Sequence, residues 1–337
     1  MEIAGPSGGR LGKVTSKPCG VWRVSSGAPW PSSSALVAEM SGSVNTRLAG
    51  APDIDAPAAG PTTRHAAVTL VAAGDVACGP DIEVTDRQCQ QEATADLVES
   101  LSPDAVLVLG DTAYEQVTVD SLKSYDVSWG RFLDKTQAVV GNHEYYGDGP
   151  DAYWDYFGDR AGPRGEGWYS FDVGAWHVVV LNSECEHVGC DADSDQGQWL
   201  AADLADNSAR CTLAAFHRPR FSSGDEYGDD ESVSDFWQVL QDAGVDVVLN
   251  GHEHSYERFA PQRDSGRATT EEGMAEFVVG TGGRNLRGFG DPKPNSEVRW
   301  NDSFGVLGLT LRPDGYDWRF HGTPGTSRVD QGSASCR

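Results

Sequence analysis

The sequence predicts an α/β fold whose sheets are covered by helices on their outer faces. Short apolar runs, typical of buried strands, alternate along the chain with segments that have helical spacing. These runs are apolar almost throughout, as expected for strands covered on both faces. Polar residues collect directly after the runs, at the strand ends where α/β folds place their functional sites.

The length and charge of the chain limit the classes of protein to consider. Its 337 residues are enough for one large domain or two small ones. Residues 1–66 contain six Lys/Arg and four Asp/Glu, which gives them a formal charge of +2. The whole chain has a charge of −25, so residues 67–337 carry −27. Such an acidic body argues against nucleic acid as a partner and can attract multivalent cations. We expect no membrane span, because no apolar run approaches the ~20 residues required.

The chain divides into a low-complexity segment and a folded part. Residues 1–66 are rich in Gly, Ser, Ala, Pro and Thr, and we interpret them as a disordered N-terminal extension. Residues 67–337 are expected to form the folded domain. The expected strands are 67–73, 105–109, 138–140, 168–173, 176–181, 212–216, 245–249, 276–279, 306–311 and 316–320. Helical spacing appears over 92–101, 196–204 and 233–243.

The seven cysteines favour an oxidising compartment. Cys78 and Cys89, and likewise Cys185 and Cys190, are close enough in sequence to close small loops. The odd count leaves at least one thiol free or paired between chains, and scattered reduced cysteines in a cytosolic protein are the alternative. We therefore expect an extracellular or secreted protein. No signal peptide is recognised, because Glu39 interrupts the one short apolar run well below the required ~7–15 residues.

Two histidines follow the strand expected at 245–249. Gly251 allows a sharp turn, and His252 and His254 are two residues apart. In extended backbone such positions point to the same side, which suits a metal site, although an ordinary polar loop is the alternative. A His-Glu-x-x-His zinc motif is excluded because the required position is Tyr256.

Polar residues that could take part in a metal site also follow four other expected strands. The polar residues at these strand ends are Asp75, Asp111, Asn142, His143 and His217. A Gly precedes Asp75, Asp111 and Asn142, which permits close approach of the backbone. Each position alone could be a turn or a core histidine. Together, carboxylate, amide and imidazole donors suit two hard or borderline divalent or trivalent metals, and they exclude soft copper(I) or iron–sulfur chemistry.

These motifs resemble those of the calcineurin-like metallophosphoesterases. The matching residues are Gly74-Asp75, Gly110-Asp111, Gly141-Asn142-His143-Glu144, His217 and Gly251-His252-Glu253-His254. The stretches 110–114 and 251–258 look like the purple acid phosphatase branch in particular. The resemblance covers about residues 67–322 and implies a four-layer αββα sandwich of two mixed sheets. Residues 1–66 are too short for the N-terminal β-sandwich domain of plant-type purple phosphatases.

The resemblance also implies a role for each site residue. Asp111 would bridge two metals. Asp75, Tyr114 and His254 would hold one of them, Fe(III) in the purple branch. Asn142, His217 and His252 would hold the second, which could be Fe(II), Zn(II) or Mn(II). His143 resembles the family's non-ligand histidine beside the leaving group, whereas Arg218 has no role to inherit.

The implied reaction is hydrolysis of small phosphomonoesters by direct attack of a metal-bound hydroxide. A phosphodiesterase of the same superfamily and a catalytically silent metal-binding domain are the alternatives. Gly280-Thr281-Gly282-Gly283 is interpreted as a tight turn in preference to a phosphate cradle. The aromatic segment 145–157 could either wall a substrate pocket or pack locally. The oligomeric state is left open.

Overall fold

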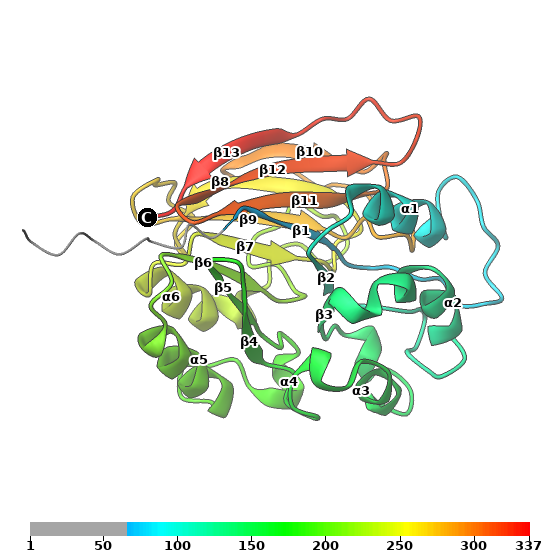
Figure 1. Ribbon diagram of the computed structural model, residues 1–337, viewed down its shortest axis with the longest axis horizontal. Coiled ribbons are helices and arrows are strands. Elements are labelled where there is room, and N and C mark those ends of the chain that lie inside the picture. Colours follow the sequence, from blue (N-terminus) through cyan, green and yellow to red (C-terminus); the bar gives the residue numbers. More distant parts are fainter. Residues whose placement is uncertain (1–65) are drawn as a thin grey trace, which may run out of the picture. The chain divides into compact units, whose positions relative to one another are not determined.

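A computed structural model describes residues 66–337 of the protein (Figure 1). The extension predicted over residues 1–66 lies outside this range except for its last residue. Two β-sheets form the centre of the described part, and helices cover their outer faces. The strand–helix alternation expected from the sequence is therefore confirmed.

The first sheet has six strands in the order β13-β12-β11-β1-β2-β3. Its strands are β1 (Val68–Ala73), β2 (Ala105–Leu109), β3 (Thr136–Val139), β11 (Gly305–Arg312), β12 (Gly315–Gly322) and β13 (Gln331–Ser335). β1, β2 and β3 are parallel, with Leu70 opposite Ala105 and Val106 opposite Thr136. β11 pairs with β1 in the antiparallel direction, so the sheet is mixed.

The second sheet has seven strands in the order β10-β8-β9-β7-β6-β5-β4. Its strands are β4 (Tyr169–Val173), β5 (Trp176–Val180), β6 (Cys211–Ala215), β7 (Val247–Asn250), β8 (Tyr256–Gln262), β9 (Met274–Val279) and β10 (Ser296–Trp300). β5, β6 and β7 are parallel, whereas the β4–β5 and β8–β9 pairs are antiparallel.

The helices complete the layers. They are α1 (Gln91–Leu101), α2 (Leu122–Val127), α3 (Asp151–Phe157), α4 (Cys185–Val188), α5 (Asp195–Asp206) and α6 (Ser234–Asp242). Four 3₁₀ turns accompany them: η1 (Trp129–Lys135), η2 (His143–Tyr145), η3 (Gly158–Ala161) and η4 (Glu231–Val233). In Figure 1, α5 and α6 lie together at the lower left, and α1 and α2 lie at the right.

Side chains alternate between the two faces of each strand and thereby divide the core. On β5, Val178 and Val180 join the core that both sheets share, whereas Val179 packs with Leu200 and Trp237 of α5 and α6. On the other sheet, α1 packs against β11 and β12. The molecule is thus the four-layer αββα sandwich with two mixed sheets that the resemblance implied.

Several elements were missed in the sequence. β8, β10 and β13 carry polar residues in positions where an apolar run is the usual signal of a strand. Glu257 on β8, for example, is fully buried but accepts hydrogen bonds from the backbone N and the hydroxyl of Ser223. The aromatic segment 145–157 contains α3, whose Tyr153, Trp154 and Phe157 are buried.

Three disulfides crosslink the described chain. Cys78–Cys89 and Cys185–Cys190 close the two small loops expected from the sequence. Cys211–Cys336 joins β6 to the segment after β13 across a sequence separation of 125, a pairing that spacing could not indicate. Cys19 lies outside the described residues. Three bonds of this kind favour an oxidising compartment.

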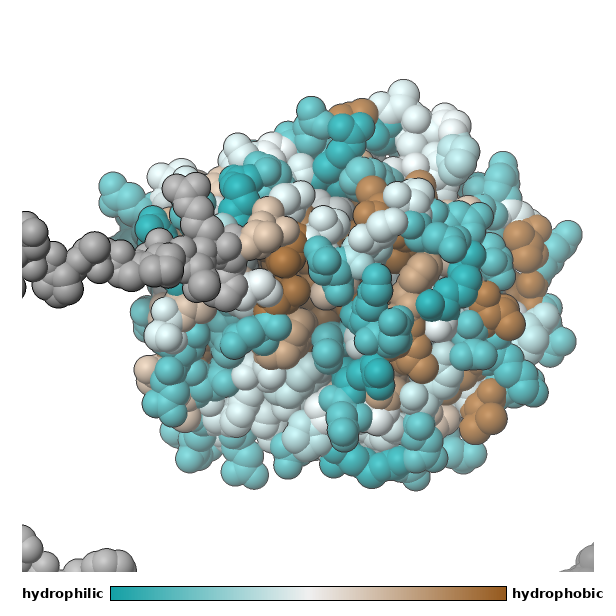
Figure 2. All heavy atoms as spheres, in the orientation of Figure 1, coloured by the Kyte–Doolittle hydropathy of each residue, from teal (hydrophilic) through white to brown (hydrophobic). Residues whose placement is uncertain are grey.

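On the face drawn in Figure 2 most residues are hydrophilic, and the hydrophobic ones are scattered among them. Among residues 66–337, none of the helices has the length and apolar character needed to cross a membrane.

Candidate metal centre

The strand ends of the two sheets bring the predicted site residues together. Asp75 follows β1, Asp111 and Tyr114 follow β2, and Asn142 and His143 follow β3. From the second sheet, His217 follows β6, and His252 and His254 follow β7. All eight side chains are buried, with exposed fractions from 0% to 6%. Contacts between them join residues up to 179 positions apart in the sequence, as between Asp75 and His254.

The backbone at these positions adopts conformations that non-glycine residues rarely take. Asp75, Asp111 and His252 have φ angles of 61°, 52° and 71°. Such strain persists only where the surroundings impose it, and it clusters at functional sites. Glycine is required at position 141, because a Cβ there would lie 2.4 Å from Asp111 Oδ1.

The hydroxyl oxygen of Tyr114 and three donor atoms around it form a compact set. Tyr114 Oη lies 2.8 Å from Asp75 Oδ1, 2.9 Å from Asp111 Oδ2 and 3.0 Å from His254 Nε2. His254 Nε2 also lies 3.2 Å from Asp75 Oδ1. We call this set the first donor group: three oxygens and one nitrogen.

A second set of four donor atoms converges around His217. His217 Nε2 lies 3.2 Å from Asn142 Oδ1, 3.2 Å from His252 Nδ1 and 3.3 Å from Asp111 Oδ1. Asp111, His217 and His252 also stand out as a compact cluster of potential metal ligands. We call this set the second donor group: two oxygens and two nitrogens.

Asp111 is the one residue that belongs to both groups. Its Oδ2 faces Tyr114 in the first donor group, and its Oδ1 faces His217 in the second. The two groups are therefore neighbours that share a single carboxylate.

The charges in the site are strongly coupled. Burial alone would raise the pKa of Asp111, but His217 and His143 hold it well below its usual range. Burial would lower the pKa of His217, yet Asp111 raises it to about 10. Burial, reinforced by His217 and Arg218, holds the pKa of His252 well below its usual value, which favours the neutral imidazole that ligates metals.

The donor set fits two cations. Burial, and after it the charges of Asp111 and Asp75, raises the pKa of Tyr114 well above its usual value. Three oxygens of acidic groups thus meet in a buried site, where ionising all of them costs free energy unless a cation balances the charge. Carboxylate, phenol, amide and imidazole donors match hard or borderline metals.

Backbone contacts fix the orientation of the histidines. Nδ1 of His217 lies 2.7 Å from the carbonyl oxygen of Leu109, and a carbonyl can only accept, so Nδ1 carries the proton and Nε2 faces the second donor group. Nδ1 of His143 donates in the same way to the carbonyl of Glu115, at 2.6 Å. His143 Nε2 then points inward, 3.7 Å from Asp111 Oδ2.

Glu144 is a supporting residue to which sequence reasoning gave no role. Its buried carboxylate accepts hydrogen bonds from the backbone N–H groups of Asp111, Thr112 and Gly141 at 3.0, 2.7 and 2.7 Å. It therefore ties the loop after β2 to the loop after β3. Its place directly after Asn142-His143, in the quoted motif, was the available signal.

The two open interpretations of loop segments now have answers. Gly280 and Gly282 donate backbone hydrogen bonds to Ser255 and Gly74, and a Cβ on Gly280 would lie 2.0 Å from the carbonyl oxygen of Glu253. The segment 280–283 is a bend whose glycines pack closely against neighbouring backbone. The aromatic segment divides: α3 packs locally, whereas Tyr145 and Tyr146 line a cavity.

That cavity, of about 390 Å³, opens beside the second donor group. We call it the Arg218 cavity; Asn142, Tyr145, Tyr146, Glu184, Glu186 and Arg218 are among its lining residues. Glu184 is 6% exposed, and its carboxylate accepts two hydrogen bonds of 2.8 and 3.0 Å from Arg218. Arg218 Nη1 in turn lies 3.3 Å from His252 Nε2.

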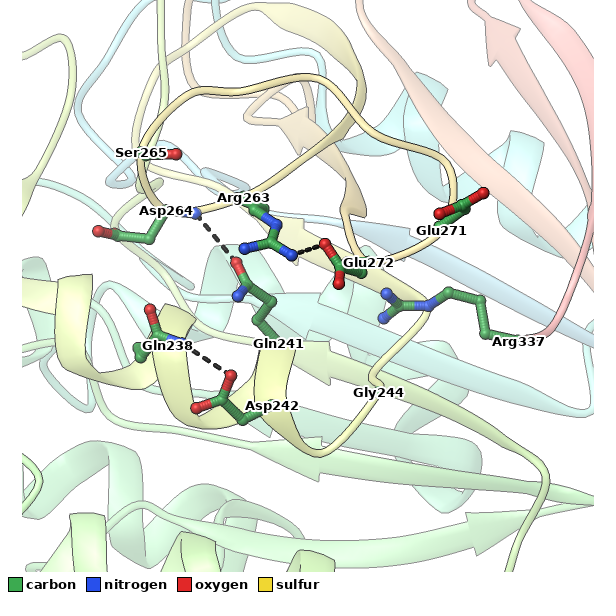
Figure 3. Close-up of a pocket in the computed structure, with 10 residues that line it drawn as sticks. All are labelled: Gln238, Gln241, Asp242, Gly244, Arg263, Asp264, Ser265, Glu271, Glu272 and Arg337. Carbon is green, nitrogen blue, oxygen red and sulfur yellow. Dashed lines mark hydrogen bonds and ion pairs between the residues drawn. The ribbon is translucent and has the colours of Figure 1, made fainter.

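A larger cavity of about 520 Å³ lies elsewhere, at the C-terminal end of α6 (Figure 3). None of the predicted site residues lines it. Figure 3 shows Arg263 directed at Glu272, with which it forms an ion pair, and Gln238 directed at Asp242. Arg263 and Glu272 neutralise each other, and neither donor group lies beside this cavity, so size alone does not make it the functional site.

Comparison with known proteins identifies the class. The family model for calcineurin-like phosphoesterases matches residues 68–256, more than half of the chain, and the protein belongs to this family. The match spans every residue of both donor groups. Family membership implies a binuclear metal centre.

Within the family, the chain is similar to purple acid phosphatases. It is 36% identical over 148 residues to purple acid phosphatase 22 of Arabidopsis thaliana, covering 41% of this chain and 32% of that protein. It is 31% identical over 160 residues to purple acid phosphatase 18 of the same plant, covering 45% and 36%. The chain thus spans about a third of the length of these two relatives.

A solved structure shares the fold. The purple acid phosphatase PPD1 from yellow lupin (Lupinus luteus) seeds aligns with a TM-score of 0.63 at 20% identity, over 81% of this chain and 54% of that chain.

Proposed function

We propose that the protein hydrolyses phosphate monoesters at a centre of two metal ions, and that residues 67–337 form the catalytic domain. The observation that carries the proposal is Asp111, whose two carboxylate oxygens face two separate donor groups. A single carboxylate between two sets of ligands is what a pair of adjacent metals needs.

The donor groups suggest how the metals are divided. Asp75, Tyr114 and His254 would hold one ion, and Asn142, His217 and His252 the other, with Asp111 shared. The oxygen-rich first group suits Fe(III), and the second suits Fe(II), Zn(II) or Mn(II). When bound, such a pair polarises phosphoryl oxygens and lowers the pKa of coordinated water.

His143 is placed to handle the proton of the leaving group. Its Nδ1–H is committed to the carbonyl of Glu115, so Nε2 is the atom available to the reaction. That atom points toward the shared carboxylate and is buried beside Tyr114, with ring centroids 4.2 Å apart. Held in this way, Nε2 would deliver a proton to the departing alcohol oxygen.

Two substrates and a metal analysis test the proposal. The protein, loaded with iron and with zinc or manganese, should hydrolyse p-nitrophenyl phosphate much faster than bis(p-nitrophenyl) phosphate. The reverse preference would support a phosphodiesterase of the same family. Binding of two metals with neither ester hydrolysed would support a catalytically silent domain.

We also propose an extracellular location, which the three disulfides favour. Thiol trapping of the native protein would check it, by showing all three pairs oxidised in material recovered outside the cell. Recovery from the cytosol with free thiols at these six positions would contradict it.

A further inference from the structure

We propose that the Arg218 cavity receives the alcohol part of the substrate and selects phosphate monoesters of amino alcohols, whose leaving group carries a cationic nitrogen. This inference rests on the proposed function and adds a substrate class to it. Three features of the cavity support it: its position, its distribution of charge and its aromatic wall.

The position of the cavity makes it the natural place for the leaving group. Asn142 belongs both to the second donor group and to the cavity wall. Arg218, also in the wall, reaches to 3.3 Å from His252 Nε2. A phosphate ester held at the metal centre can therefore extend its alcohol into this space of about 390 Å³, enough for a small organic group.

The wall of the cavity carries more negative than positive charge. Arg218 is the only Lys or Arg in the wall, and it lies at the end that touches the metal centre. Glu184 already takes two of its N–H groups. Asp230, with Oδ2 3.9 Å from Arg218 Nη1, and the exposed Glu186 add two further carboxylates. The wall therefore has three carboxylates against one guanidinium, an excess of negative charge that suits a cationic group.

Two tyrosines supply surfaces for a cation. Tyr146 is 45% exposed, and its hydroxyl accepts a hydrogen bond of 2.9 Å from Asn142 Nδ2, which fixes the ring beside the metal centre. Tyr145 is held by Asn182 and is stacked on His187 with ring centroids 4.0 Å apart. An ammonium group is attracted both to ring faces and to carboxylates.

The same charges disfavour another kind of substrate. An ester whose alcohol carries further phosphate groups would place them against Glu186 and Asp230, where like charges repel. The cavity is therefore matched to a zwitterion, with its anion at the metal end and its cation at the outer end.

The reaction consumes one water for each ester cleaved. The water oxygen forms a new bond to phosphorus as the bond between phosphorus and the ester oxygen breaks. One proton of the water passes to the departing oxygen, so the products are inorganic phosphate and a neutral hydroxyl that still carries the cationic nitrogen.

The test uses a pair of esters that differ only in charge. Phosphocholine and 3,3-dimethylbutyl phosphate have the same shape, but a carbon replaces the cationic nitrogen in the second. For the metal-loaded full chain we expect kcat/KM to be about tenfold higher for phosphocholine at low ionic strength. The ratio should shrink in 1 M salt.

Variants connect the preference to the cavity. Glu186→Gln and Asp230→Asn each remove one charge, and Asn at position 230 keeps the oxygen that accepts from Ser232 N. Each should lower the ratio to about threefold, and the double variant should bring it close to one. Glu271→Gln, which removes an exposed carboxylate in the cavity of Figure 3, is the matched control and should leave the ratio unchanged.

The outcomes separate this inference from the proposed function. Hydrolysis of p-nitrophenyl phosphate with a ratio near one in the wild type would overturn the cavity proposal and leave the phosphatase standing. If no ester is hydrolysed, the binding of choline and of 3,3-dimethylbutanol is measured by ligand-observed NMR. This comparison then tests the cavity proposal. Equal binding, or no binding of choline, overturns the proposal; preferential binding of choline that Glu186→Gln weakens supports it.

Discussion

The two donor groups share Asp111 but differ in the charge they present. In the first donor group, Asp111 is joined by a second carboxylate, a phenol and one imidazole. In the second, it is joined by two imidazoles and a neutral amide. The first therefore balances a more highly charged ion than the second, since each acidic oxygen can contribute a negative charge.

The difference follows from which sheet supplies which donor. The loops after β1, β2 and β3 supply every oxygen, and the loops after β6 and β7 supply every nitrogen. Each donor group combines both sheets, so neither is complete without the packing of one sheet on the other. We expect the two positions to be distinguishable by substitution, and the predictions below are ordered by the size of the expected effect.

The largest effect is expected from Asp111→Asn. An amide cannot place negative charge on both groups at once, so both metals should be depleted and hydrolysis of p-nitrophenyl phosphate should fall by more than about 100-fold. Elemental analysis of the purified variant measures the metals directly. If it still finds two metals per chain, Asp111 is not the shared ligand and the comparison between the groups fails.

Substitutions that touch only one group should deplete only one metal. Asp75→Asn affects the first donor group, and Asn142→Ala affects the second. Each variant should retain about one metal per chain, and the retained metal should differ between them, with iron lost preferentially from Asp75→Asn. Equal loss of both metals in both variants would show that the centre assembles only as a unit.

Tyr114→Phe tests whether the first group holds Fe(III). A phenolate bound to Fe(III) gives a charge-transfer band in the visible range, whereas Zn(II) or Mn(II) gives none. The wild type loaded with iron should be coloured, and Tyr114→Phe, which removes one oxygen and little volume, should lose the band. An unchanged band in the variant, or a colourless iron-loaded wild type, would contradict the phenolate assignment.

The contrast between the centre and its surroundings explains what the sequence could reveal. Every donor residue directly follows an apolar strand or sits in a short motif after one. Local pattern was enough to single out all of them except Tyr114, which only the family resemblance implied. Glu184 and Arg218 face each other across 34 positions and lie in loops, where no periodicity marks a contact. The Cys211–Cys336 bond, which spans 125 positions, could not be predicted for the same reason.

Strands without a continuous apolar run were equally hard to recognise. β8 contains Glu257 and Arg258, and β13 has the sequence Gln-Gly-Ser-Ala-Ser. Both depend on partners far along the chain: Glu257 on Ser223, and β13 on its pairing with β12. Tertiary contacts, which the sequence does not display, decide their conformation.

A smaller and more even effect is expected from Glu144→Gln. Glu144 supports both donor groups through the backbone of Asp111 and Gly141. It is not itself a member of either donor group. A Gln side chain offers one acceptor oxygen where Glu144 uses two. Affinity for both metals should therefore fall together, by about 10-fold to 100-fold. Metal titrations followed by calorimetry measure this, and selective loss of one metal would contradict the shared role.

The smallest effect on the centre is expected from Glu276→Gln, a change in a buried carboxylate remote from both groups. Glu276 is fully buried on β9, where one oxygen accepts from Arg220 N and Phe221 N and the other has no hydrogen-bond partner among residues 66–337. Burial, with the charge of Glu257 adding to it and these backbone hydrogen bonds opposing it, raises the pKa of Glu276 well above its usual value. The folded protein thus keeps a proton that the unfolded chain releases above about pH 4.3, and this side chain makes the wild type less stable as pH rises from there.

Gln carries no such proton, so thermal melts should show little difference at pH 4 and a variant that melts roughly 2–4 °C higher at pH 8. Its metal content should match the wild type at both pH values. A melting difference that does not grow with pH would mean that Glu276 is ionised in the fold, and loss of metal would mean that depletion in the other variants reflects general destabilisation.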